Sequence, residues 1–210
     1  MFAKKSESLL LSISAITAIT MLFVPLSLYV VIPWVLLLIA SAFLFYFFRD
    51  PERVAPDEDG IVVSPAEGKI IDVVSLPDES RQIQIELSVW DVHVNRAPVD
   101  CKITKITREK GAHWPVWYNR YYAKRNARQH YDIETTDGNK FRVTQIAGIF
   151  AWRCVSYVSE GAQLSQNDKF GIIRFGSAAY VTFPKDSPYE ITITKGEKIR
   201  AGESIIARRK

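Results

Sequence analysis

The stretch GIIRFGSAAYVTFP (residues 171–184) places a Gly-Ser bond, Gly176–Ser177, between two apolar runs. The second run, residues 180–183, has the β-branched and aromatic composition of a strand. Strands are usually bounded by polar turn residues. A flexible surface Gly-Ser pair is therefore unusual at a position between two apolar, strand-like runs. Taken alone, the two residues would indicate only a tight connection between strands.

Most of the C-terminal part of the chain has the signals of β structure. Apolar and polar residues alternate over residues 82–89, which predicts a half-buried strand. Asp137-Gly138 separates YDIET from KFRVT and predicts a hairpin. Residues 69–74 are also strand-like, whereas residues 113–129 lack a clear period and predict a long loop or irregular helix.

Two segments near the C-terminus repeat weakly. YVSEGAQLSQNDKFGII and ITKGEKIRAGESII align at an offset of 35, so that Gly161 matches Gly196 and Leu164 matches Ile199. Two copies are too few for a solenoid. They indicate two related hairpins, as in the sandwiched barrels of lipoyl-carrier domains. The sequence has no carrier-lysine motif, which disfavours a carrier function, and the Gly-Ser bond lies between the copies.

The bulk composition narrows the classes of function. The chain has 27 Lys and Arg against 23 Asp and Glu, a net charge of +4. This excess suits an anionic membrane surface and is too small and scattered for nucleic-acid binding. Cys101 and Cys154 form no CxxC pair, and the three histidines have no zinc-site spacing. One disulfide could form, but two free thiols in a reducing compartment are the simpler interpretation.

The N-terminal segment contains 40 consecutive uncharged residues, 9–48. One helical span needs about 20 residues. Pro25 and Pro33 interrupt the run, which predicts two helices, residues 9–24 and 34–48, joined by a turn. Each helix is short for a full span, so a re-entrant hairpin is an alternative.

Basic residues flank both ends of this apolar segment. Lys4 and Lys5 precede it, and Arg49 and Arg53 follow it. Positive charge at both ends predicts that both ends lie on the cytoplasmic side. A cleaved secretory signal is disfavoured, because no small-residue cleavage motif precedes the charged part. We therefore expect a membrane anchor at residues 1–48 and a catalytic domain at residues 49–210.

Three motifs together carry a resemblance to a known family. RFGS (174–177), SPAEGKI (64–70) and SVWDVHVNRAPVD (88–100) resemble the short form of phosphatidylserine decarboxylase, over about residues 47–207. Enzymes of this family are made as one inactive chain, which cuts itself at a Gly-Ser bond. The resemblance implies a cut between residues 176 and 177, giving a large chain, 1–176, and a small chain, 177–210.

The resemblance also implies the chemistry of the cut. The Ser177 hydroxyl attacks the carbonyl of Gly176, and the resulting ester eliminates to dehydroalanine. Hydrolysis then gives ammonia and a pyruvoyl group, so that Ser177 becomes the covalent pyruvate cofactor. Its ketone forms a Schiff base with a substrate amine and accepts the electron pair released as carbon dioxide leaves.

Two ionisable residues gain roles from the same resemblance. His93 matches a site histidine and is the candidate acid/base, a role that suits a group titrating near neutrality. Strand alternation predicts that Asp91, His93 and Asn95 share one face. Glu67 is the candidate processing base, although the family motif usually reads SPADG, with a shorter acid. The simpler alternatives are a hydrogen-bonded core histidine and a turn carboxylate.

The chain departs from the family pattern at several positions. Long-form relatives carry a second histidine where this chain has Arg96, as short forms do. Ala178 and Ala179 follow the Gly-Ser bond, where short relatives usually carry Arg-Val-Asp. Asn126 is retained in AKRNARQ, but the acidic residues of that motif are lost. These changes bear on substrate specificity.

The predicted protein is mainly β, a lipoyl-like barrel-sandwich domain with an N-terminal membrane-embedded helical hairpin at the cytoplasmic face of the cell membrane. We expect a self-processing pyruvoyl enzyme that converts phosphatidylserine to phosphatidylethanolamine and carbon dioxide, its two chains forming a heterodimer without a metal. One alternative is archaetidylserine decarboxylase, and another is a non-catalytic membrane-anchored lipoyl-like binding module. A pyruvoyl decarboxylase of a soluble amino acid is disfavoured by the apolar segment.

Overall fold

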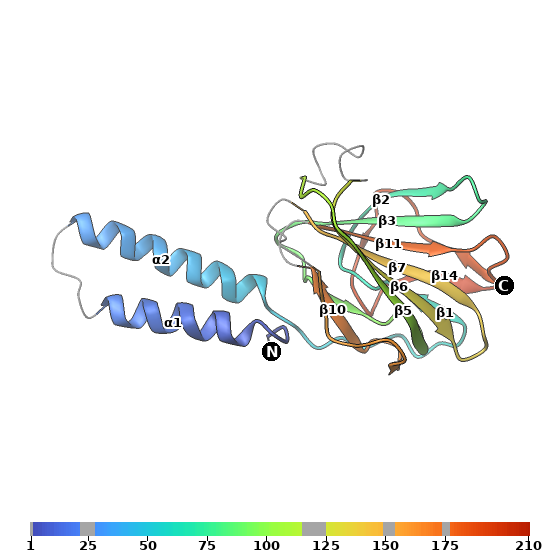
Figure 1. Cartoon of the computed structure of the whole chain (residues 1–210), viewed down its shortest axis with the longest axis horizontal. Helices are drawn as coiled ribbons and strands as arrows, with labels where there is room; N and C mark the ends of the chain where they lie inside the picture. The colour runs from blue at the N-terminus through green and yellow to red at the C-terminus, as the bar shows by residue number, and fades with distance from the viewer. Residues whose placement is uncertain (1, 22–27, 115–124, 149–153, 174–176) are drawn as a thin grey trace. The chain divides into compact units, whose positions relative to one another are not determined.

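The structure is a computed structural model that describes residues 2–21, 28–114, 125–148, 154–173 and 177–210 (Figure 1). The chain divides into two compact units, Met1–Glu52 and Arg53–Lys210. We call them the helical unit and the β unit. The protein is mainly β, as predicted. In the described residues, helices α1 and α2 lie in the small first unit, and the strands lie in the larger second unit.

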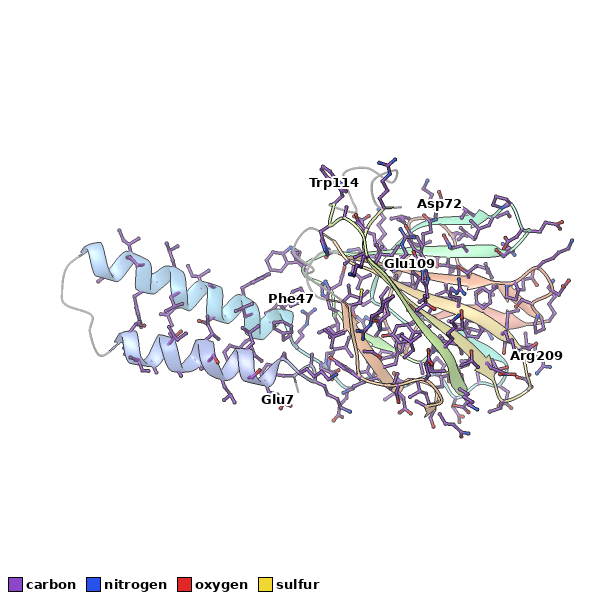
Figure 2. All side chains as sticks on the ribbon, in the orientation of Figure 1. Glu7, Phe47, Asp72, Glu109, Trp114 and Arg209 are labelled. Carbon is purple, nitrogen blue, oxygen red and sulfur yellow. The ribbon has the colours of Figure 1, made fainter. Side chains whose placement is uncertain are left out.

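The helical unit is a pair of antiparallel helices, α1 (Glu7–Met21) and α2 (Leu28–Phe47). Ala3 N donates to Phe48 O over 2.9 Å, which holds the two outer ends of the pair together. The side chains that project from both helices in Figure 2 are almost entirely carbon. Large apolar side chains are exposed on both, including Leu11, Ile19 and Leu36.

One expectation for this unit needs correction. Pro33 was predicted to lie before the second helix but lies inside α2, where a proline removes one backbone hydrogen bond without ending the helix. Pro25 falls outside the described residues. Among the described residues, neither helix is long and apolar enough to cross a membrane.

The described residues of the β unit form three antiparallel sheets, several strands of which are labelled in Figure 1. The large sheet has the order β13-β2-β3-β11-β7-β6-β5-β9, and the small sheets have the orders β1-β14-β12 and β4-β10-β8. The strands are β1 (Ile61–Val63), β2 (Gly68–Ser75), β3 (Arg81–Leu87), β4 (Val94–Arg96), β5 (Cys101–Glu109), β6 (Arg128–Thr135), β7 (Lys140–Ile146), β8 (Cys154–Ser156), β9 (Gln163–Leu164), β10 (Lys169–Ile173), β11 (Ser177–Phe183), β12 (Tyr189–Ile191), β13 (Lys198–Ile199) and β14 (Ile205–Arg209).

Several strands lie where the sequence predicted them. In β3 the inward residues Ile83, Ile85 and Leu87 are buried, whereas the residues between them are partly exposed. β6 and β7 form the predicted hairpin, and Gly138 in its turn has a φ of 84°, a conformation that favours glycine. The predicted loop at 113–129 is too long, because β6 begins at Arg128. Residues 115–124 lie outside the described part.

The predicted C-terminal repeat is present in the backbone. Gly161 and Gly196 both have positive φ angles, 85° and 98°, and each precedes a short strand, β9 or β13. The next turns also match, since Asn167 and Gly202 have φ angles of 74° and 76°. Each copy then continues into a longer strand, β10 or β14.

A second duplication escaped the sequence analysis. β4 and β5 begin 33 positions after β1 and β2 (94 against 61, and 101 against 68). Val63 N donates to Pro98 O over 2.9 Å, and reciprocally Arg96 N donates to Pro65 O over 3.0 Å. The β unit therefore contains two related halves. The first half comprises β1, β2, β13 and β14, and the second half comprises β4, β5, β9 and β10.

Candidate active site

The Gly-Ser bond lies at the start of a central strand of the large sheet. Ser177 is the first residue of β11, and its backbone lies opposite Leu87 of β3. β11 pairs with β3 from Ser177 onward and with β7 from Ala178 onward, so the strand is held on both sides directly after its first residue. Gly176 lies outside the described residues. The preceding strand, β10, ends at Ile173 in a different sheet.

His93 is fully buried beside the strand that leads into this bond. Its backbone carbonyl accepts a hydrogen bond from Ile173 N over 3.2 Å. Its ring Nδ1 lies 2.8 Å from the carbonyl oxygen of Asp91. Because a carbonyl oxygen can only accept, Nδ1 carries the proton in the neutral ring. Nε2 is then the basic nitrogen, the one able to take up a proton.

The predicted face shared by Asp91, His93 and Asn95 is wrong, because β4 begins only at Val94. Residues 88–91 instead form a turn, in which Asp91 N donates to Ser88 O over 3.0 Å. The Asp91 carboxylate accepts from Ser88 N over 2.7 Å. Asp91 therefore shapes the loop that carries His93 and contributes its carbonyl, rather than its carboxylate, to the ring.

Glu67 joins the SPAEG turn (residues 64–68) to the loop of His93. Its Oε1 accepts from Val92 N over 3.3 Å, and its Oε2 accepts from the Arg53 guanidinium. The side chain is 15% exposed. An ionised carboxylate has about four acceptor sites, so these two contacts leave Glu67 able to accept further hydrogen bonds. The Glu67 carboxylate thus lies at the backbone of Val92, the residue before His93.

A chain of hydrogen bonds, which begins at the exposed Arg108 and is buried from Gln129 onward, supports the SPAEG turn. Starting at Arg108, each side chain donates to the next, and the last donates to the carbonyl of Pro65. Gln129 donates to the Tyr131 hydroxyl, which donates to Gln145 over 3.2 Å. The other links are Arg108 Nε to Gln129 Oε1 at 2.8 Å, Gln145 Nε2 to Asn95 Oδ1 at 2.7 Å, and Asn95 Nδ2 to Pro65 O at 3.1 Å.

This donor chain was not found from the sequence, although alternation contains a signal for it. In KFRVTQI, the residue Gln145 follows Phe141 and Val143 at a spacing of two, which places an amide on an apolar face. A buried amide needs partners, so it indicates a polar network. Burial raises the pKa of Tyr131 to about 12, so its hydroxyl remains a donor at neutral pH.

A cavity of about 540 Å³ opens beside Glu67. Three cationic side chains lie along it, Lys69, Lys198 and Arg200. The rest of its lining is Glu67, Gly68, Glu86, Ser88, Asp91 and Ile199. Ser88 directly follows Leu87, the residue opposite Ser177, so the cavity adjoins the start of β11.

The remaining predictions concern metals and thiols. Within the described ranges, no group of three or more His, Cys, Asp and Glu side chains could hold a metal ion. Cys101 and Cys154 are free and buried. Burial raises the pKa of each thiol to about 12, which keeps both protonated and unreactive at neutral pH.

Known proteins with similar sequences belong to one family. The family model described as phosphatidylserine decarboxylase matches residues 40–207. A phosphatidylserine decarboxylase proenzyme of Oleidesulfovibrio alaskensis is 39% identical over 181 residues, which cover 84% of this chain and 82% of the relative. One from Symbiobacterium thermophilum is 36% identical over 174 residues, 80% of each chain. A proenzyme of Methanosarcina mazei, provisionally named archaetidylserine decarboxylase, is 42% identical over 161 residues, 77% of this chain and 73% of the relative.

Proposed function

Because the chain belongs to the phosphatidylserine decarboxylase family, we propose that it converts phosphatidylserine to phosphatidylethanolamine and carbon dioxide after cutting itself between residues 176 and 177. It is a carboxy-lyase made as a proenzyme, as its relatives are named. The proposal rests on two hydrogen bonds that join three segments of the chain: the SPAEG turn, the loop of His93 and the end of β10. The Glu67 carboxylate binds Val92 N, and the neighbouring His93 carbonyl binds Ile173 N, just before the Gly-Ser bond.

We assign the proton transfers to the two ionisable residues in these segments, Glu67 and His93. Glu67 is the proton acceptor during self-cleavage, since its carboxylate is held in place and still has acceptor capacity. His93 is the acid/base of decarboxylation. The Asp91 carbonyl fixes its tautomer, so Nε2 can take up a proton and return it to the carbon that loses carbon dioxide.

The pyruvoyl group derived from Ser177 would supply the electron sink for cleavage of the carbon–carbon bond. The residues present fit such a group at the start of β11. The strand is paired on both sides, so a new N-terminus at residue 177 would keep its place. β13 and β14 also pair with strands of the large chain, β2 and β1. These pairings support a heterodimer of chains 1–176 and 177–210 that persists after the cut.

We place the serine headgroup in the cavity beside Glu67. The headgroup carries a phosphate and a carboxylate against one ammonium, so it is anionic overall. The lining combines three cations, Lys69, Lys198 and Arg200, with three carboxylates, so it offers partners to the anionic groups and to the ammonium of such a ligand. The cavity reaches the residue next to Leu87, which would bring the headgroup amine near residue 177.

We further propose that the helical unit holds the enzyme at the cytoplasmic face of the cell membrane. The exposed apolar side chains of α1 and α2 support this, because such a surface is costly in water. The two related halves support the proposal that the β unit is a lipoyl-like barrel-sandwich. Archaetidylserine is the second candidate substrate, since the Methanosarcina mazei relative bears that name at comparable identity.

An intact mass of the full chain purified from membranes tests the proposal. We expect two species, one ending at Gly176 and one starting at residue 177 and lighter than a serine-headed chain by ~17 Da, the mass of ammonia. Ser177→Ala is the control and should remain one chain. An uncut wild-type chain would contradict the proposal and favour the non-catalytic binding module.

Turnover is tested separately from the cut. The processed enzyme should release carbon dioxide from phosphatidylserine vesicles, and archaetidylserine vesicles assayed in parallel distinguish the two candidate substrates. His93→Ala should still be cut but should lose turnover by roughly 10²- to 10⁴-fold, the usual contribution of a general acid/base. Full turnover in that variant would remove His93 from the mechanism.

A further inference from the structure

Arg53 lies between two carboxylates that belong to distant parts of the chain. Its Nη2 pairs with Glu67 Oε2, and its Nη1 donates to Glu203 Oε2 over 3.0 Å. The Arg53 side chain is 11% exposed, against 15% for Glu67 and 30% for Glu203. Such a guanidinium is held by its partners rather than moving freely at a surface, because its fork bonds each carboxylate through a different nitrogen.

The backbone of Arg53 is fixed as well. Its carbonyl accepts from Asn167 Nδ2 over 2.6 Å. Asn167 is the turn residue with a φ of 74°, and its Oδ1 and backbone oxygen accept from Arg96 Nη1, each over 3.2 Å. Arg53 therefore enters the β unit at a preorganised position, and its side chain needs little further ordering to reach Glu67.

Glu203 connects this arrangement to the C-terminal segment. It follows Gly202, whose N–H donates to Ser64 O over 2.8 Å, and precedes Ser204, whose carbonyl accepts from Ser64 N over 2.8 Å. The segment that would become the small chain thus binds the SPAEG turn directly through its backbone. Through Glu203 it also holds the guanidinium that contacts Glu67.

We propose that Arg53 is a positioning residue for self-cleavage. It holds the Glu67 carboxylate in the orientation in which Oε1 faces Val92, beside His93, and Glu203 keeps the guanidinium in place. The inference rests on the proposed function, because it assigns Arg53 an effect through the processing base. Its consequence is that self-cleavage requires residues 202–204 to be folded onto the SPAEG turn.

The rate of self-cleavage of the freshly synthesised full chain in membranes tests this role. Arg53→Ala should slow the cut on the order of 10- to 100-fold, the cost of misplacing a reacting group by about 1 Å. Arg53→Lys should recover part of the rate, because one ammonium cannot bond both carboxylates as the fork does. Glu203→Gln should slow the cut less than Arg53→Ala. Arg142→Ala, which breaks a separate pair with Asp132 (2.6 Å), should cut at the wild-type rate.

Two further measurements separate positioning from a general loss of folding. Guanidinium chloride at millimolar concentration should accelerate the cut of Arg53→Ala, whereas equal sodium chloride should not. The double variant Arg53→Ala with Glu67→Gln should cut no more slowly than Glu67→Gln alone, because both changes act through one carboxylate. Thermal unfolding of Arg53→Ala in the uncuttable Ser177→Ala chain reports the cost to folding.

The outcomes distinguish this inference from the proposed function. If the wild-type chain is cut and Arg53→Ala is cut equally fast, Arg53 has no positioning role and the proposed function stands. Additive effects of Arg53→Ala and Glu67→Gln, without rescue by guanidinium, would also overturn the inference. A wild-type chain that is never cut overturns both.

Discussion

The two halves of the β unit share one backbone plan but differ in what surrounds their first turn. In the first half, Glu67 follows Pro65 and precedes β2. In the second half, Asp100 follows Pro98 at the same offset of 33 and precedes β5. Glu67 Oε1 accepts from Val92 N, beside His93, whereas Asp100 Oδ1 accepts from Gln166 N over 2.6 Å, within its own half.

The comparison shows that a local turn with a carboxylate is not sufficient for a site. Both halves provide a proline, an acid and a following strand. Only the first half places the acid against the loop of His93 and near the strand that begins at Ser177. The chemistry we propose therefore arises from contacts that come from outside the repeated unit.

The acid itself gives the sharpest test of this difference. Glu67→Gln removes the proton acceptor, and we expect self-cleavage to slow by about 10²- to 10⁴-fold. Asp100→Asn is the matched change in the second half and should leave the rate within about twofold, because its backbone bond can be kept by the amide oxygen. Time courses of the intact mass measure both. Equal slowing in the two variants would mean that the comparison is wrong.

The next test compares the residues that follow the two acids, Gly68 after Glu67 and Cys101 after Asp100. It measures the free energy of unfolding. A Cβ on Gly68 would lie 2.2 Å from the backbone oxygen of Glu86, so an alanine forces β2 and β3 apart. The second half has Cys101 at this position, a buried thiol that is uncharged at neutral pH. We expect Gly68→Ala to cost about 3 kcal/mol or more of unfolding free energy.

Cys101→Ala is the control and should cost only about 1 kcal/mol, for the loss of one small buried group. Denaturant unfolding of both variants in the uncuttable Ser177→Ala chain gives the two values. A stable Gly68→Ala chain would show that β3 can yield, and that the close approach of the backbones does not define the first half.

The proline carbonyls differ in their second donor. Pro65 O accepts from buried Asn95, the end of the donor chain in the core, whereas Pro98 O accepts from Gln166 Nε2 over 3.1 Å in a partly exposed position. Asn95→Ala leaves the Gln145 amide without its acceptor, at a cost of about 1–3 kcal/mol. Gln166→Ala should cost less than about 1 kcal/mol, because water can replace it.

The same unfolding assay compares these two variants. We also expect Asn95→Ala to slow self-cleavage, because the SPAEG turn loses its internal support. Equal costs for the two variants would mean that the buried donor chain adds nothing to an ordinary surface hydrogen bond.

The sequence predicted the parts of this fold that depend on local period and turn chemistry. The alternation of β3, the Asp-Gly hairpin and the C-terminal repeat all depend on residues close in the chain, and all three are confirmed. Pro33 was misplaced because α2 continues through the proline at the loss of one backbone hydrogen bond, so the proline does not mark where the helix begins.

The site was harder to predict because its contacts are long-range. The motifs around Glu67 and His93 could be recognised, but not the hydrogen bond that joins them across 25 residues. The contact of Arg53 with Glu203 spans 150 residues and leaves no pattern in either segment. The duplication at an offset of 33 escaped notice because only its turn and strand positions repeat, while the side chains around Gly68 and Cys101 have diverged.

The cavities beside the two acids give the smallest effect. Both cavities are lined by three carboxylates, but the cavity beside Asp100, about 710 Å³, has one cation, Lys102, against three in the cavity beside Glu67. In the first half the matching positions carry Lys69, Lys198 and Arg200, where the second half has Lys102, Gln163 and Ser165. An anionic headgroup should therefore favour the first cavity, although exposed charges in water each contribute only about 1 kcal/mol.

We expect Lys198→Glu to raise the KM for phosphatidylserine by roughly 3- to 10-fold with little change in kcat, and added salt should reduce the difference. Lys102→Glu makes the same charge reversal beside Asp100 and should leave KM unchanged. Because both lysines stand next to the acid-bearing turn of their own half, a general effect of charge on membrane binding would appear in both variants. A rise in KM confined to Lys198→Glu would support headgroup binding in the cavity beside Glu67. An equal rise in both variants would contradict that placement.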